Sequence, residues 1–136
     1  MLAGAQTPTD EFNELLKTKD LNQIQTWLKA QIWYGSSGDM EHLRRFWHIN
    51  FGKRPDFKPN FIVPNMGSIL RCLSDGKGIA VIPDFLSRKE RDSGNIKLLW
   101  EGYNLIENTL YFGTRKKSIY AEQIAMVQEI FEREMV

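Results

Sequence analysis

The sequence predicts an α/β fold with a mixed, mostly parallel sheet flanked by helices. Two apolar runs, Gly78–Ile82 and Ile96–Trp100, have the length of strands. The first run is apolar at nearly every position, which is typical of a strand that is covered on both faces. Segments with helical spacing of apolar residues lie before, between and after these runs. Alternation of strands with helices favours a parallel arrangement of the strands.

The first half of the chain is predicted to be mainly helical. Helical segments have apolar residues at spacings of three and four, and acidic residues favour the start of the first one, because the helix dipole attracts negative charge there. Asp39 is expected to cap the third helix and Gly52 to end it. The expected elements are a helix at Asp10–Leu16, a helix at Asp20–Lys29, a strand at Gln31–Tyr34 stopped by Gly35–Gly38, and a helix from Asp39 to Phe51.

The second half is predicted to alternate between strands and helices. Pro64 and Pro83 each close a strand, and Gly76 fits the position after a helix. The expected elements are strands at Phe61–Val63, Gly78–Ile82, Ile96–Trp100 and Thr109–Phe112, and helices at Ser68–Asp75, Asp84–Arg91 and Ser118–Glu134.

Composition limits the classes of function. The 18 basic and 17 acidic side chains give a net charge of +1, which does not indicate a surface that binds DNA or anionic lipid. The single cysteine, Cys72, has no internal disulfide partner, and this fits a reducing compartment. No apolar run is long enough for a membrane span, and no signal-peptide pattern is visible. We therefore expect a cytoplasmic protein with no membrane partner.

The sequence contains no convincing catalytic or metal-binding constellation. His42 and His48 are six residues apart, which does not place two ligands on one helix face. Gly76-Lys77-Gly78 follows a helix and precedes a strand, the reverse of the order that binds phosphate at a helix N-terminus. We therefore expect no catalytic residue, no metal and no cofactor. The aromatic residues near Trp33 and Trp47 suggest one packed core, and Trp33 stays open as a stacking surface.

The segment from Phe61 to Leu86 resembles the effector-binding domain of LysR-type transcriptional regulators. The resemblance lies in the strand Phe61–Val63, the polar stretch Pro64–Ser68, the glycine pair Gly76 and Gly78, and the buried strand ending at Pro83. Further matches are Leu43-Arg44-Arg45-Phe46-Trp47 upstream, and Ser93–Trp100 and Leu110–Lys116 downstream. The match covers the chain from about Thr18 to its C-terminus.

The resemblance implies a periplasmic-binding-protein-like (type 2) fold of two α/β subdomains, with a small effector bound in the cleft between them. It also implies a bacterial regulator with an N-terminal winged helix-turn-helix. The sequence departs from this pattern, because the helix-turn-helix and most of the first subdomain are absent. We therefore expect residues 1–136 to form a partial effector-binding domain, with the second subdomain at about 18–107 and a returning strand and closing helix at about 108–136. Met1–Gly4 would be the end of the strand before the second subdomain.

By matching position, the resemblance places the effector contacts at the ends of strands. These contacts are Gln31, Trp33, Ser36, Ser37, Pro64, Asn65 and Met66. Hydroxyl, amide and backbone N–H groups there would hold a small anionic or polar ligand. Ser36 and Asn65 could equally cap the helices that follow them, and both roles are compatible.

The function that the resemblance implies is effector sensing, with DNA contacted only through the helix-turn-helix of a parent protein. The closing helix has an apolar stripe, including Ile124, Val127 and Phe131, which would pack on strands absent from this chain. We expect it to repack on the same chain or on a second copy, as a homodimer or a swapped arrangement. The alternative function is a solute-binding protein or transporter component on the same fold.

Overall fold

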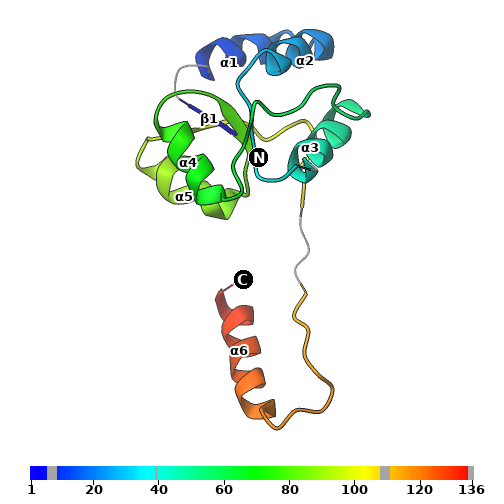
Figure 1. Ribbon diagram of the computed structural model, residues 1–136, viewed down its shortest axis with the longest axis vertical. Helices are drawn as coiled ribbons and strands as arrows, with labels where there is room; N and C mark the ends of the chain where they lie inside the picture. The colour runs from blue at the N-terminus through cyan, green and yellow to red at the C-terminus, as the bar shows by residue number, and fades with distance from the viewer. Residues whose placement is uncertain (6–8, 39, 108–110, 135–136) are drawn as a thin grey trace. The chain divides into compact units, whose positions relative to one another are not determined.

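A computed structural model of the chain describes residues 1–5, 9–38, 40–107 and 111–134. The chain divides into two compact units, Met1–Ile106 and Glu107–Val136 (Figure 1). This division lies one residue from the predicted boundary between 107 and 108. Residues 1–5 and the first helix belong to the same unit as the predicted second subdomain.

The first unit is a small α/β domain in which helices and short strands alternate. Its described elements, in chain order, are β1 (Leu2–Gly4), α1 (Thr9–Lys17), α2 (Leu21–Lys29), β2 (Tyr34–Gly35), α3 (Glu41–Phe51), β3 (Phe61–Ile62), α4 (Met66–Ser74), β4 (Ile79–Val81), α5 (Asp84–Asp92) and β5 (Lys97–Trp100). The described part of the second unit contains one helix, α6 (Ala121–Glu134).

The strands form two sheets that a single bridge connects. In the three-stranded sheet the order is β4-β1-β5, and β1 is antiparallel to both neighbours. In the two-stranded sheet β2 and β3 are parallel, and a parallel bridge joins Trp33 next to β2 with Ile79 of β4. The strands therefore lie in the order β3-β2-β4-β1-β5, and only β1 runs against the other four.

Both parallel and antiparallel pairing occur, but the antiparallel pairs lie in the three-stranded sheet and the parallel pair in the two-stranded sheet, so the prediction of mostly parallel pairing is wrong. Every ladder of the three-stranded sheet is antiparallel, because the N-terminal strand β1 inserts between β4 and β5. Neither partner is near β1 in the sequence, so no local pattern indicates this insertion. The coarse α/β class is as predicted.

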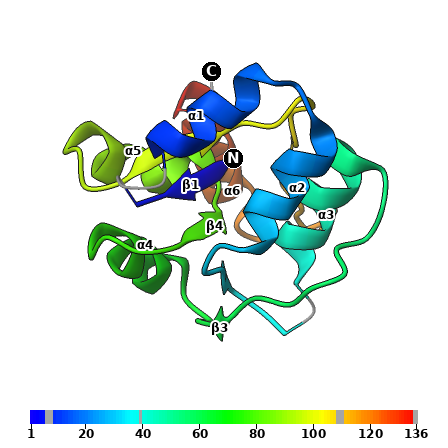
Figure 2. The ribbon, with the colours of Figure 1, turned by 90° about the horizontal axis from the view of Figure 1, so that it is seen from above.

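Alternate strand residues place two apolar clusters on opposite faces of the sheet. Leu2 and Ile79 belong to the cluster that α1, α2 and α3 cover, whereas Ala3 and Ala80 belong to the cluster that α4 covers. Figure 2 shows α4 on one side of β4 and α2 and α3 on the other. The first unit is therefore three-layered, and its sheet is covered on both faces, as the apolar runs predicted.

Two predicted strands differ from the observed elements. The strand predicted at Gln31–Tyr34 is displaced toward Gly35, because Gly35 pairs with Ile62 and its carbonyl accepts from the Val63 amide at 2.8 Å. The strand predicted at Thr109–Phe112 falls partly outside the described residues, and its described part, Tyr111 and Phe112, is not a strand. A strand needs a neighbour to pair with, and none lies beside these two residues in the described part of the second unit.

The helix end expected at Gly52 is confirmed, whereas Ser36 does not cap the helix that follows it, because the N-cap of α3 is Met40. Asp20 caps α2 by accepting from the amides of Asn22 and Gln23. Gly52 ends α3 at a φ of 70°, in the left-handed region that favours glycine. Asp39, the cap predicted for α3, lies outside the described residues. Helix α4 begins at Met66, two residues earlier than predicted, because Asn65 supplies its cap.

Candidate functional site

The carboxyl ends of three parallel strands meet at one edge of the sheet. Strand β2 leads into Ser36 and Ser37, β3 into Val63–Asn65, and β4 into Ile82 and Pro83. Each of these connections leads to the N-terminus of a helix, namely α3, α4 and α5. In open α/β sheets ligands bind at such an edge, where helix N-termini and free loop backbone lie together.

A small hollow, part of it open to solvent, lies at this edge, and only about 10 Å³ of it is available to the centre of a water-sized sphere. It is formed by residues 33–37 at the end of β2, residues 40–43 at the start of α3, and Val81 of β4. This space holds about one water molecule. The hollow would therefore serve as one wall of a larger site, or would have to widen to take a small ligand.

The polar groups of the hollow come from two neighbouring segments. Ser36 and Ser37 carry hydroxyls, and Glu41 and His42 lie in the first turn of α3. Burial raises the pKa of the Tyr34 phenol, and the charges of Cys72 and Asp75 raise it further. The Tyr34 side chain packs against the cluster that α4 covers, so its hydroxyl is not counted among the polar groups of the hollow. The first amide groups of a helix have no partner within the helix, so this turn also favours an acceptor.

The helix α3 begins in an unusual backbone conformation beside the hollow. Its N-cap residue, Met40, has a φ of 58° and a ψ of 34°, and its side chain makes no capping hydrogen bond. The Met40 amide donates to the Ser37 carbonyl at 3.2 Å. A left-handed conformation is uncommon for a residue other than glycine, asparagine or aspartate. It turns the chain sharply, so that the serines and the first turn of α3 border the same space.

Three of the predicted contact residues border the hollow, namely Trp33, Ser36 and Ser37. Both serines are half-buried. The Trp33 side chain is only 1% exposed, and its Nε1–H donates to the Leu28 carbonyl at 2.7 Å. Its indole therefore belongs to the core, and its donor is already satisfied, so it does not act as an open stacking surface.

The other four predicted residues, Gln31, Pro64, Asn65 and Met66, do not border the hollow. The Gln31 side-chain amide donates to the Trp27 carbonyl near the end of α2, at 3.0 Å. Asn65 caps α4 by accepting from the Ser68 amide at 3.1 Å, which is one of its two predicted roles. Met66 lies in the first turn of α4 and packs against the apolar cluster on that face.

Sequence reasoning missed the half of the hollow that α3 and β4 provide. Tyr34, Glu41 and His42 were not predicted to contact a ligand, although they flank the predicted serines closely in the sequence. Glu41 and His42 could have been predicted, because a helix that begins after a strand and a polar loop starts at the edge of the sheet where ligands bind. Val81 could not be found in this way, since only the parallel bridge between Trp33 and Ile79 brings β4 beside β2.

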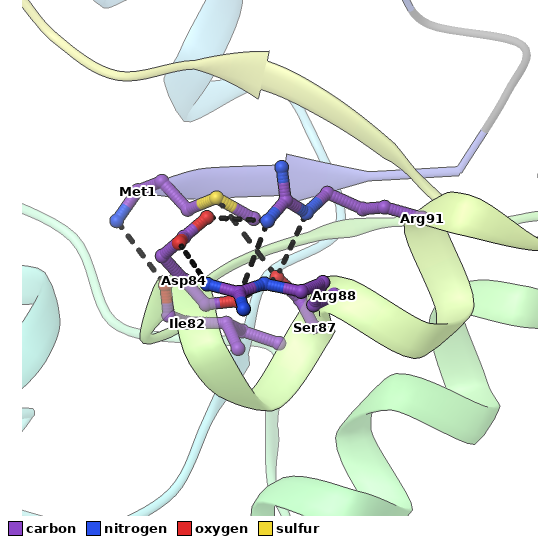
Figure 3. A network of polar contacts seen from close by, with 6 residues as sticks. All are labelled: Met1, Ile82, Asp84, Ser87, Arg88 and Arg91. Atoms are coloured by element: carbon purple, nitrogen blue, oxygen red, sulfur yellow. Dashed lines mark hydrogen bonds and ion pairs between the residues drawn. The ribbon is translucent and has the colours of Figure 1, made fainter. Parts of the chain in front are cut away.

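A second polar cluster lies where β1 meets α5 (Figure 3). The Met1 amine donates to the Ile82 carbonyl at 3.1 Å, and burial lowers the pKa of this amine. Arg91 forms an ion pair with Asp84 and donates to the Ser87 hydroxyl at 3.2 Å. Asp84 also pairs with Arg88, and the hydrogen bond from Met1 to Ile82 and the contacts around Asp84 hold α5 beside β1.

Three further findings concern the whole described chain. Residues 1–5, 9–38, 40–107 and 111–134 contain no group of three or more histidine, cysteine or acidic side chains placed to hold a metal ion. Within the same ranges no helix has both the length and the apolar character needed to cross a membrane. Comparisons of the chain with protein-family models, curated proteins and solved structures found no match.

Proposed function

We propose that this chain is an effector-binding domain of a bacterial LysR-type transcriptional regulator, which binds a small anionic or polar ligand. The observation that carries the proposal is the hollow at the carboxyl edge of β2 and β4, bordered by Ser36, Ser37 and the first turn of α3. It lies where the resemblance places part of the effector contacts.

The strand order supports the finer proposal of a periplasmic-binding-protein-like (type 2) subdomain. The resemblance implies that Met1–Gly4 is the end of a strand which leads into the second subdomain. Strand β1 spans Leu2–Gly4 and lies inside the sheet, antiparallel to β4 and β5. Helices α1 and α2 then connect it to β2, the first of the strands that run the other way. A chain that arrives from another subdomain would enter the sheet in this manner.

The chemistry of the hollow favours a small ligand with hydrogen-bond acceptors. Hydroxyl groups of Ser36 and Ser37 can donate to a carboxylate or carbonyl, and a helix N-terminus attracts negative charge. Glu41 lies at the same place and disfavours a highly charged anion. We therefore expect a monocarboxylate or a neutral polar molecule in preference to a di- or tricarboxylate. The parent protein would transmit the binding event to its DNA-binding region.

Filling the hollow tests this proposal. We expect a panel of small monocarboxylates to contain ligands that raise the melting temperature of the chain, because a ligand at about 100 times its Kd stabilises the folded state by about 2.7 kcal/mol. In the variant Ser36→Trp the bulky indole would block the opening of the hollow, and the same ligands should give no shift.

Ser93→Trp is the matched control, because Ser93 is exposed and lies in the turn after α5, outside the residues that border the hollow. It should keep the full ligand-induced shift. A ligand that still protects the folded Ser36→Trp variant would contradict a site in the hollow.

A further inference from the structure

The last residues of the first unit are attached to the end of helix α3. Residues 101–106, which we call the exit segment, follow β5, and Glu107 begins the second unit. The Asn104 backbone amide donates to Asn50 Oδ1 at 3.1 Å, and the Asn104 side-chain amide donates to the Ile49 carbonyl at 3.1 Å. Because Ile49 and Asn50 lie in the last turn of α3, these two hydrogen bonds join the exit segment to that helix.

Asn50 is oriented for this contact by its own helix. Its side chain is buried, and the side-chain amide donates to the Phe46 carbonyl one turn earlier, at 2.9 Å. This bond fixes the side chain, so that Oδ1 accepts from outside the helix. A buried polar group destabilises the fold when it lacks a partner. The exit segment therefore supplies the donor that the buried Asn50 oxygen requires.

Gly102 allows the backbone of the exit segment to approach Asn50 closely. It has a φ of +92°, in the left-handed region that favours glycine. A Cβ at this position would lie 2.5 Å from Asn50 Oδ1 and 2.7 Å from Asn50 Nδ2. Both the backbone conformation and the space beside Asn50 therefore exclude a side chain while the exit segment is attached.

The exit segment buries little apolar surface. The Tyr103 ring contacts Trp100 edge-on, but Tyr103 is 49% exposed and Leu105 is 65% exposed. Only Ile106 packs against the apolar cluster that α1, α2 and α3 cover. If the segment leaves, water can reach Asn50 and replace the lost hydrogen bond. Detachment therefore requires much less free energy than unfolding of the whole unit.

We infer that a latch holds the exit segment on α3 and opens while the rest of the first unit stays folded. The latch residues are Ile49, Asn50, Gly102 and Asn104. Opening adds residues 101–106 to the connection between the two units and lengthens its reach by up to about 20 Å. The latch therefore sets the length of this connection. This inference does not depend on the proposed function of the first unit.

Amide hydrogen exchange of the full chain tests the latch. The Asn104 amide should be protected about 100-fold, and much less than the amides of Ile79 and Ile82, which donate to backbone carbonyls at 2.8 and 2.9 Å. Gly102→Ala should lower the protection of Asn104 at least tenfold, while Ile79 and Ile82 remain the more protected amides.

Gly94→Ala is the matched control for this variant. Gly94 also has a positive φ, +80°, but a Cβ there would meet nothing within 4 Å. The control should keep Asn104 more than tenfold better protected than Gly102→Ala does. An unprotected Asn104 amide, an Asn104 amide as protected as Ile79 and Ile82, or equal protection of Asn104 in the two variants would overturn the inference.

Limited digestion with chymotrypsin gives a second readout of the open latch. The side chains of Tyr103 and Leu105 are already exposed, so the rate of cleavage after them reports release of the backbone. Gly102→Ala, and Asn50→Ala where it folds, should raise this rate at least tenfold. Tyr111, which is 90% exposed, serves as the internal reference and should be cleaved at an unchanged rate. Unchanged cleavage after Tyr103 and Leu105 in Gly102→Ala would contradict the latch.

Discussion

Gly78→Ala is expected to destabilise the first unit by about 3 kcal/mol or more, because an alanine side chain has no room there. Gly78 has a φ of +89°, and a Cβ would lie 2.5 Å from Tyr34 Cε2 and 2.9 Å from the Ile32 carbonyl oxygen. The backbone is fixed on both sides, since the Ile79 amide donates to that carbonyl at 2.8 Å. Neither the carbonyl nor the half-buried ring can move away without breaking the contact between β2 and β4.

Gly76→Ala is the matched control for this prediction. Gly76 also has a positive φ, +101°, but a Cβ there would meet nothing within 4 Å. Only the backbone strain remains, so the expected cost is about 1 kcal/mol. Urea unfolding followed by tryptophan fluorescence measures both changes. Equal losses of stability in the two variants would show that close packing at Gly78 is not what the sheet requires.

The second large effect is expected at Trp33. Trp33→Phe removes the Nε1–H that donates to the Leu28 carbonyl at 2.7 Å, and leaves that acceptor and part of the indole volume unfilled. Trp33 is 1% exposed and contacts the rings of Trp47 and Phe57. We expect a loss of about 2–4 kcal/mol in the free energy of unfolding.

Trp47→Phe provides an informative comparison at a neighbouring buried ring. Trp47 is fully buried, and its Nε1 has no hydrogen-bond partner among the described residues. Its replacement by phenylalanine removes a buried N–H group whose missing hydrogen bond destabilises the fold. The stability regained in this way offsets the loss of ring contacts. The expected net loss is about 0–1 kcal/mol. Chemical denaturation followed by circular dichroism compares the two variants, and a larger loss in Trp47→Phe than in Trp33→Phe would contradict these roles.

The fold was predictable where residues near one another in the sequence determine it. The continuous apolar run around β4 and the periodic apolar stripe of α6 each indicated an element from neighbouring residues alone. The position of β1 was different, since its three residues carry no period and its partners Val81 and Trp100 lie far along the chain. The antiparallel insertion of β1 depends on contacts between residues far apart in the sequence. The alternation of strands and helices does not predict such contacts.

The candidate site, too, could be predicted only in part from the sequence. Ser36 and Ser37 were predicted by their matching position in the resemblance, whereas His42 and Val81 reach the hollow only through the packing of α3 and the bridge to β4. For Asn65 the sequence allowed two roles and could not distinguish them. An asparagine before a helix fits both a cap and a ligand contact, and only its hydrogen bond to the Ser68 amide shows that it caps α4. The residue type suggests the possible roles, and the contacts in the structure show which role the residue has.

The central claim is that the first unit binds a small ligand in the hollow. Its most direct test is amide chemical-shift mapping of the isotope-labelled chain, titrated with the monocarboxylate that gives the largest thermal shift. The account predicts saturable shifts concentrated at residues 33–37 and 40–43, with little change in α4 and α6. Saturable shifts centred elsewhere on the chain, or no shift at millimolar concentrations of any member of the panel, would contradict it.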